Sequence, residues 1–327
     1  MVKIGNIEFE EVPVMLAPME DITDPSFRFL CKQFGADMVY TEFISSDGLI
    51  RNGAKSVKKL DIFDYERPVG IQIYGHIPGA MKEAAVMAES ARPDLIDLNF
   101  GCPVKKIARR GAGAGMLRDI PLLLEITRTV VETVSLPVTV KTRLGWDEQN
   151  KVIVSLARQL QDAGIQALTI HGRTGTQLYK GRADWSLIGE VKNDPAITIP
   201  IIGNGDIDSP EKAREMLDKY GVDGLMIGRA AIGRPWIFQQ VKHYLRTGKL
   251  LPEPTLKEKV GLARLHLEKS LEFKGIPRGI YEMRRHFVHY FKNLPDFKPL
   301  RIRLLTTLEP EEINSILDEI ETRYSGL

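Results

Sequence analysis

One of the two cysteines of this chain, Cys102, lies where a strand-length apolar run, residues 95–101, comes to an end. A cysteine thiol is mostly protonated at neutral pH, so it can donate a proton in general acid catalysis. As a nucleophile it would need a base, and the adjacent sequence offers none, although a distant partner such as His171 stays open. We therefore interpret Cys102 as a candidate proton donor. We interpret Cys31, on an apolar helix, as a buried, inert thiol.

Polar side chains interrupt other apolar runs. Gln72 lies between two isoleucines, Lys141 and Arg143 share one face of a strand, and so do His171 and Arg173. A lysine inside an apolar strand is unfavourable unless an anion or a dipole meets it. These side chains are candidate ligand contacts. The alternatives are a structural ion pair for Lys141 and a hydrogen-bonded core position for His171.

Glycines cluster near the ends of the last two apolar runs. Gly203 and Gly205 lie toward the end of one run, and Gly228 and Gly233 lie at and just after the end of the next, with Arg229 beside them. In a barrel the loops after strands 7 and 8 commonly hold a phosphate through backbone N–H groups. Because glycines occur at both positions, the pattern indicates a phosphate site.

The elements that would position these residues alternate between strands and helices. Eight apolar, often β-branched runs predict strands at 12–19, 38–44, 69–75, 95–101, 137–145, 167–173, 199–207 and 224–230. Amphipathic stretches between them predict helices at 79–91, 120–134, 150–164 and 209–221, among others. Eight such repeats predict a TIM (β/α)8 barrel. A doubly wound sheet is the alternative, but its glycine-rich phosphate turn is missing after the first strand.

After a linker at 247–255 the period becomes helical throughout, which predicts a smaller C-terminal helical bundle. We expect a barrel domain at 1–245 and a helical domain at 246–327. Residues 256–303 carry a net charge of +7, which favours a polyanionic partner, although a solvated face is the alternative. One bundle helix carries polar residues opposite its apolar face: Tyr281, Arg285, His289 and Lys292.

Composition excludes several classes of protein. The 327 residues are 43% apolar and 27% charged, which is enough for a large soluble core. The N-terminal residues lack an apolar signal region, and no apolar run is long enough for a membrane span. Two cysteines give no disulfide framework, and the six histidines show no metal-ligand spacing. We expect a cytoplasmic protein without a metal site.

At these residues the chain resembles the tRNA-dihydrouridine synthase family, and its bacterial B-type branch in particular. The similar stretches occur in the family's order: APMEDITD, DLNFGCPVKKI, VTVKTRLGW, ALTIHGRT, GNGDI and MIGRAAIGRPWIF. They span nearly the whole predicted barrel. The resemblance implies an FMN-dependent enzyme that reduces uridine to dihydrouridine in tRNA, with NADPH or NADH as the reductant.

The resemblance also implies residue roles. It implies flavin contacts from Pro18, Met19, Glu20, Gln72, Lys141 and His171. It implies contacts to the FMN phosphate end from Asn204, Gly205, Asp206, Gly228 and Arg229. It implies substrate contacts from Asn99, Arg173, Lys105, Lys106, Arg109 and Arg110. Glu20 stands where a small residue is expected in the B-type branch.

Together these roles imply a reduction in which Cys102 takes part as the proton donor. Reduced flavin would pass hydride to C6 of a uracil turned out of its stack, and Cys102 would protonate C5. The basic loop 105–110 would receive flanking phosphates, and the glycines of 111–115 would let it close; a solubilising surface is the alternative.

Two other functions stay open at this point. One is a flavin oxidoreductase for a free pyrimidine, similar to dihydroorotate dehydrogenases, but a small substrate would not need the basic helical segment. The other is a tRNA-binding or chaperone protein with an inactive barrel, against which the polar set around Cys102 argues.

Overall fold

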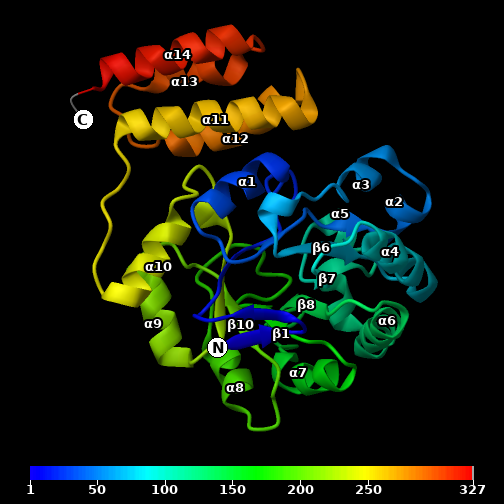
Figure 1. Ribbon diagram of the computed structural model, residues 1–327. Helices are drawn as coiled ribbons and strands as arrows, with labels where there is room; N and C mark the ends of the chain where they lie inside the picture. The colour runs from blue at the N-terminus through cyan, green and yellow to red at the C-terminus, as the bar shows by residue number, and fades with distance from the viewer. Residues whose placement is uncertain (326–327) are drawn as a thin grey trace.

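A parallel barrel dominates the computed structural model, which describes residues 1–325 (Figure 1). Its strands are β3 (Val14–Leu16), β4 (Val39–Tyr40), β6 (Val69–Tyr74), β7 (Leu95–Phe100), β8 (Val138–Arg143), β9 (Leu168–His171), β10 (Ile201–Asn204) and β11 (Gly224–Ile227). Hydrogen bonding follows the order β3-β11-β10-β9-β8-β7-β6-β4, and a bridge between Met15 and Met38 brings the ends together. The predicted TIM barrel is confirmed, and the open doubly wound alternative is wrong.

Each of the eight predicted runs contains one of these strands, but three further strands were not predicted. β5 (Ile44–Ser45) pairs with the end of β6. β1 (Val2–Ile4) and β2 (Ile7–Phe9) form an antiparallel hairpin. Ile4 and Phe9 of the hairpin belong to a buried cluster with Met15, Leu95 and other residues from the strand starts. The hairpin therefore covers the amino-terminal end of the barrel.

Helices surround the barrel between the strands. They are α1 (Pro25–Gln33), α4 (Pro78–Ser90), α6 (Ile120–Thr133), α7 (Ile153–Asp162), α8 (Ser186–Asn193), α9 (Pro210–Tyr220) and α10 (Ile237–Thr247). Shorter elements are α2 (Ser46–Ile50), α3 (Ala54–Lys58), α5 (Lys105–Ala108) and the 3-10 turns η1 (Asp64–Glu66), η2 (Gly113–Arg118) and η3 (Arg229–Ala231). The four predicted helices correspond to α4, α6, α7 and α9. Among the described residues, no helix combines the length and apolar character needed to cross a membrane.

The alternation along β8 divides the barrel wall into two environments. Val138 and Val140 belong to the core between the strands and the outer helices. Thr139 and Lys141 have the opposite direction and make polar contacts across the barrel interior, Thr139 with Asp97 on the neighbouring β7 and Lys141 with Asn204 on β10, two strands away. The strands thus use one face for the hydrophobic core and the other for a polar interior.

Four helices follow the linker and form the predicted bundle: α11 (Leu256–Lys274), α12 (Arg278–Tyr290), α13 (Lys298–Thr306) and α14 (Pro310–Arg323). They share a hydrophobic core of their own. α10 ends at Thr247, two residues beyond the expected boundary. The division of the chain into two independent domains stays a prediction.

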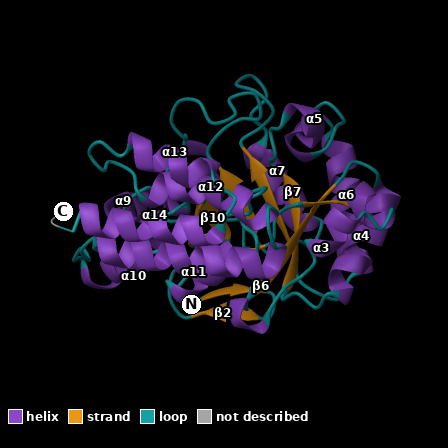
Figure 2. Cartoon of the chain, turned by 90° about the horizontal axis from the view of Figure 1, so that it is seen from above, coloured by secondary structure: helices purple, strands orange, loops and turns teal. Residues whose placement is uncertain are grey.

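The helical bundle lies over α1 on one side of the barrel (Figures 1 and 2). Phe27 of α1 packs against the rings of His266 and His286, with ring centroids 5.7 Å and 4.7 Å away, and the two histidine rings contact each other at 4.3 Å. Lys274, at the end of α11, forms a buried ion pair with Asp24 at the start of α1. Aromatic packing and a buried charge pair therefore fix the bundle against the barrel.

Candidate active site

A cavity of about 740 Å³ opens at the carboxyl ends of the strands, the end where barrels carry their active sites. Twelve predicted site residues line it: Pro18, Met19, Glu20, Asn99, Cys102, Lys141, His171, Asn204, Gly205, Asp206, Gly228 and Arg229. Six do not: Gln72, Arg173, Lys105, Lys106, Arg109 and Arg110. The structure thus brings most of the predicted site together from several strands and the loops that follow them.

A chain of hydrogen bonds crosses the barrel interior below this cavity. Thr139 Oγ1 donates to Asp97 Oδ1 (2.5 Å), and Gln72 Nε2 donates to Asp97 Oδ2 (2.6 Å). Gln72 Oε1 accepts from Asn99 Nδ2 (2.8 Å). Burial raises the pKa of Asp97 to about 6, although both hydrogen bonds favour the carboxylate. Buried Gln72 is therefore held by both ends of its amide, and it acts on the cavity through Asn99.

Asn99 fixes the turn that carries Cys102. Its Oδ1 accepts from the backbone N–H groups of Gly101 and Cys102, both at 2.9 Å. The Cys102 side chain is 7% exposed, and burial raises the pKa of its thiol above the ordinary value. The thiol therefore stays protonated at neutral pH, on the wall of the cavity.

Lys141 extends from β8 into the same cavity. Its Nζ donates to Asn204 Oδ1 over 3.1 Å, and Asn204 in turn donates to Met226 O (2.7 Å). Burial, and then the charge of Arg143, lowers the pKa of Lys141 to about 8. Within the described chain no carboxylate oxygen lies within 4 Å of this ammonium, so the alternative of a structural ion pair is not realised there.

A second cluster of charged side chains lies at the carboxyl end of β9. Arg173 donates to Asp206 Oδ2 (2.7 Å) and contacts His171 Nε2 (3.2 Å), while Arg229 donates to Asp206 Oδ1 (2.9 Å). Arg173 is buried and does not reach the cavity, so its predicted substrate contact stays a prediction. Burial and the surrounding cations lower the pKa of His171 well below its ordinary value. His171 therefore lines the cavity as a neutral ring.

The turns after β10 and β11 provide backbone donors. Gly205 has φ +126°, and a Cβ there would lie 2.7 Å from the Ala183 side chain, so glycine is required. Across residues 1–325, the N–H groups of Gly205, Asp206, Gly228 and Arg229 donate to no protein acceptor. Unpaired amides beside an arginine at a cavity wall suit a phosphate group.

The predicted flexible loop after Cys102 is ordered differently. Residues Lys105–Ala108 form the helical turn α5, and of the glycines that follow, Gly113 and Gly115 lie in η2. A Cβ at Gly113 would lie 2.7 Å from Cys102 O, and one at Gly115 would lie 2.4 Å from Ala108 O. Gly113 and Gly115 therefore permit close backbone packing against the cysteine turn, and closure of the loop over a substrate stays a prediction.

The polar face predicted on α12 meets the barrel. Arg285 donates to Asp21 O (2.9 Å), and His289 and Lys292 line the cavity. The approach depends on Gly233, where φ is +62° and a Cβ would lie 2.6 Å from the His289 Cβ. The helical bundle therefore contributes directly to the wall of the barrel cavity.

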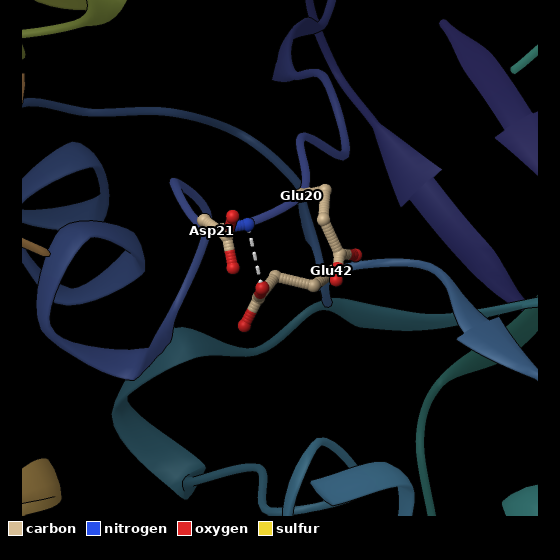
Figure 3. Close-up of side chains that lie close together, drawn as sticks. All are labelled: Glu20, Asp21 and Glu42. Atoms are coloured by element: carbon tan, nitrogen blue, oxygen red, sulfur yellow. Dashed lines mark hydrogen bonds between the residues drawn. The ribbon is translucent and has the colours of Figure 1, made fainter. Parts of the chain in front are cut away.

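An acidic cluster lies beside this contact (Figure 3). Glu20, Asp21 and Glu42 place carboxylate oxygens within 4.8 Å of one another. Lys59 lies 2.5 Å from Glu20 and 3.5 Å from Glu42, and Arg285 lies 3.1 Å from Asp21. Because lysine and arginine already compensate the carboxylates, the cluster is explained by structural ion pairing.

Some contributors to the cavity and its support were not among the predicted site residues: Asp97, Thr139, His289 and Lys292. Thr139 shares the inward face with Lys141 and Arg143, so strand alternation contained a signal for it. Asp97 depends on strand register, and His289 and Lys292 depend on how α12 meets the barrel. Periodicity alone predicts neither the strand register nor the position of α12 against the barrel.

Comparison with known proteins identifies the family. The sequence model for "Dihydrouridine synthase (Dus)" matches residues 15–323. The chain is 43% identical over 288 residues to tRNA-dihydrouridine synthase B of Pseudomonas aeruginosa, covering 88% of this chain and 86% of the relative. It is 39% identical over 323 residues to a probable tRNA-dihydrouridine synthase of Rickettsia conorii, covering 98% and 97%.

Solved structures support the fold at low sequence identity. 2-Naphthoyl-CoA reductase superposes with a TM-score of 0.58 at 13% identity, over 74% of this chain and 51% of the other. Morphinone reductase in complex with tetrahydroNAD gives 0.53 at 14% identity, over 78% and 92%. The family match spans the barrel, the cavity and the helical bundle alike. This chain therefore belongs to the dihydrouridine synthase family of oxidoreductases, and its similarity is to the bacterial B-type members.

Proposed function

We propose that this protein is a tRNA-dihydrouridine synthase that uses FMN and NADPH to reduce the C5–C6 double bond of uridine in tRNA. The observation that carries the proposal is the joint presence, in one cavity, of a protonated thiol and an ammonium without a carboxylate partner. The family match and the relatives named as tRNA-dihydrouridine synthases support the substrate.

The cavity residues fit FMN. A volume of about 740 Å³ lies within the ~300–1,000 Å³ range usual for small-molecule sites. The unpaired N–H groups after β10 and β11 suit its phosphate, and Lys141 suits the electron-rich edge of a reduced ring. When bound, the flavin supplies a hydride that it takes from NADPH or NADH.

Each residue then has a distinct task. Pro18, Met19, Glu20 and His171 shape the ring site, with Lys141 at the ring edge and Gln72 acting from below through Asn99. Asn204, Gly205, Gly228 and Arg229 hold the phosphate end, and Asp206 orients Arg229.

Cys102 completes the reduction by delivering a proton. When hydride adds to C6 of the uracil, negative charge develops on C5 and its neighbouring carbonyl. The S–H bond of Cys102 breaks and its proton passes to C5, which leaves a thiolate to be reprotonated from solvent. Asn99 fixes the peptide of Cys102 and lies in the wall where the uracil must bind. The uracil must leave its stack to reach this depth.

The tRNA would contact two regions outside the cavity. One is the basic segment of Lys105, Lys106, Arg109 and Arg110, and the other is the helical bundle with its net positive charge. Within residues 1–325, none of the four cations of the basic segment has a carboxylate partner within 4 Å, so their charges are available to phosphates.

The test is dihydrouridine formation by the purified full-length chain. Unmodified tRNA is incubated with protein, FMN and NADPH, and its nucleosides are quantified by mass spectrometry. We expect dihydrouridine to appear in tRNA and free uridine to remain unreduced. Reduction of free uridine or uracil at a comparable kcat/KM would instead favour the free-pyrimidine alternative. A protein that binds tRNA but neither FMN nor NADPH would favour the binding-protein alternative.

A further inference from the structure

A second cavity, of about 270 Å³, adjoins the candidate active site. Pro103, the residue after Cys102, lines both cavities, so the second lies one side chain away from the proposed proton donor. Trp146 and Leu178 contribute further apolar surface to its wall. The proposed reaction leaves this cavity without a role.

Trp146 is held in place on several sides. The guanidinium carbon of Arg118 lies 4.5 Å from the centre of its ring, and Arg118 Nη2 donates to Ala108 O (2.8 Å). Trp146 O accepts from the N–H of Thr176 (2.9 Å). A Cβ at Gly175 would lie 3.0 Å from Trp146 Cε3, so the indole packs closely against backbone. The cavity therefore has a preformed aromatic and cationic wall.

The charges around this cavity have one sign. Lys105, Arg109 and Arg118 line it, and its lining includes no acidic residue. In the part of the chain that the structure describes, Lys105 and Arg109 form neither ion pairs nor side-chain hydrogen bonds. The nearby Glu148 pairs with Lys151 at 2.7 Å. An apolar wall bounded by free cations is complementary to a planar base that carries a phosphate.

We propose that this second cavity binds the nucleotide next to the uridine that is being reduced. Its base lies against the apolar wall of Trp146 and Pro103, and its phosphate meets Lys105 and Arg109. Because the two cavities share Pro103, one extruded uridine and its neighbour can occupy them together. The inference rests on the proposed function and adds a site that positions the RNA chain beside Cys102.

Two double variants test the site against simple loss of positive charge. Lys105→Ala/Arg109→Ala removes two of the three cations that line the pocket and leaves Arg118 against Trp146, and Lys106→Ala/Arg110→Ala removes an equal charge from the same segment outside the pocket. All four side chains are exposed, so both proteins should unfold at the wild-type temperature. We expect the first pair to raise the KM for unmodified tRNA about 10- to 100-fold. The second pair should raise it about fivefold at most.

A modified substrate identifies the occupant. Replacing one nucleotide beside the reduced uridine with an abasic unit should raise the KM of the wild-type enzyme. The same abasic tRNA should cause little further loss in the Lys105→Ala/Arg109→Ala variant, because the base and these cations act at one site. The proposal would be overturned if the KM increases caused by the abasic unit and by Lys105→Ala/Arg109→Ala were fully additive in free energy at both flanking positions. Equal KM values for the two double variants would also overturn it.

A dinucleotide is the other ligand of similar chemistry, and a separate measurement distinguishes it. Stopped-flow reduction of the bound flavin gives the NADPH dissociation constant without tRNA. We expect that constant to be unchanged in both double variants. A selective rise in the Lys105→Ala/Arg109→Ala variant, with an unchanged KM for tRNA, would assign the cavity to the reductant. A wild-type enzyme that forms no dihydrouridine would refute the proposed function itself, and this subsite with it.

Discussion

Cys102 is suited to donate a proton because its thiol is buried and its pKa is raised. Cys102→Ala should leave flavin reduction by NADPH nearly intact, since that half-reaction involves no proton at the uracil C5. Flavin reoxidation by unmodified tRNA should fall about 10²- to 10⁴-fold, with little change in tRNA affinity. Stopped-flow absorbance measures both half-reactions.

Cys31 provides the matched control, because it is also a buried, unpaired thiol but lies on α1, away from the cavity. Cys31→Ala should keep both half-reactions at wild-type rates. A wild-type rate of reoxidation by tRNA in Cys102→Ala would exclude the thiol as the acid.

Lys141 predicts a pH dependence of flavin binding. Its pKa in the flavin-free protein is about 8, below the ordinary 10.5, because burial disfavours the charged amine. An electron-rich ligand edge favours the charged form, so binding takes up a proton above pH 8. The FMN dissociation constant should therefore be flat below about pH 7 and rise by up to about tenfold per pH unit above 8. Fluorescence titration across this range measures it.

Lys141→Met should bind FMN more weakly and lose this rise. The pH dependence of folding has the opposite sign. Between pH 8 and 10.5 Lys141 is protonated in the unfolded chain but not in the flavin-free fold. The contribution of Lys141 to the free energy of unfolding therefore increases with pH in this range. If the FMN dissociation constant changes with pH in the same way in wild type and in Lys141→Met, another group causes the pH dependence.

Asp97 is a positioning residue that acts through Gln72. The Asp97→Asn substitution leaves one acceptor oxygen for two donors, Gln72 Nε2 and Thr139 Oγ1. When that oxygen accepts from Thr139, the new amide N–H faces Gln72 Nε2, and Gln72 has to turn its carbonyl toward it. Asn99 then loses its acceptor, and the turn at Cys102 loses its support. Asp97→Asn should slow reoxidation by tRNA about 10-fold or more, the effect of removing one hydrogen bond to a charged group.

The double variant Asp97→Asn/Gln72→Glu reverses donor and acceptor along the chain while the net charge stays constant. The amide introduced at position 97 would donate to the carboxylate introduced at position 72, which would also accept from Asn99. The tRNA half-reaction should then recover relative to Asp97→Asn alone. A double variant slower than either single variant would show that the carboxylate of Asp97 is needed for its charge.

At the scale of elements, the strands of the barrel were predictable because each is a buried apolar run bounded by turn residues. β1, β2 and β5 escaped prediction because no apolar run of greater length is centred on them, whereas the equally short β3 and β4 lie inside such runs. Register was not predictable either. It places Asp97 directly between Gln72 and Thr139 on three neighbouring strands, and only this placement reveals its role.

Gly233 lies where the barrel contacts α12, and its replacement should affect both the stability of the fold and the KM for tRNA. Gly233→Ala meets a left-handed backbone and also His289 Cβ at 2.6 Å and Tyr290 N at 2.8 Å. It should destabilise the fold by more than the ~1–2 kcal/mol of the backbone conformation alone. It should also raise the KM for tRNA, because α12 carries His289 and the following residues carry Lys292.

Gly248→Ala is the matched control. Gly248 has φ +70°, and nothing lies within 4 Å of the Cβ that would be added there. This variant should lose only the backbone contribution and keep the wild-type KM. Urea unfolding and steady-state kinetics compare the two proteins. Equal losses of stability with equal KM values would mean that α12 tolerates the extra methyl group without moving.

At the scale of the whole molecule, the helical bundle contributes to the wall of the candidate active site as well as carrying the basic segment that we propose binds tRNA. The basic character of residues 256–303 and the polar face of α12 were visible in the sequence. Their placement was not, because it depends on the ring packing of Phe27 and on the ion pair between Lys274 and Asp24. The cavity of the candidate active site therefore has walls from both ends of the chain.

Charge pairing predicts which cations of the bundle bind tRNA. In the described structure Lys269, Arg278 and Arg303 pair with carboxylates at 2.7, 2.9 and 2.6 Å. Three others form no ion pair within residues 1–325: Lys292, Lys298 and Arg301. A free cation releases counterions when it meets a phosphate, whereas a paired one must first give up its carboxylate.

The triple variant Lys292→Ala/Lys298→Ala/Arg301→Ala should therefore reduce the magnitude of the negative slope of log K against log salt by roughly 0.7 to 0.9 for each phosphate that is no longer neutralised, roughly 2.1 to 2.7 if all three contacts are lost. The triple variant Lys269→Ala/Arg278→Ala/Arg303→Ala removes the same charge and should change the slope much less. Filter binding of unmodified tRNA from 50 to 300 mM salt, about the range over which such slopes are resolved, measures both. If the two variants change the slope equally, net charge alone determines binding, and the pairing pattern has no part in it.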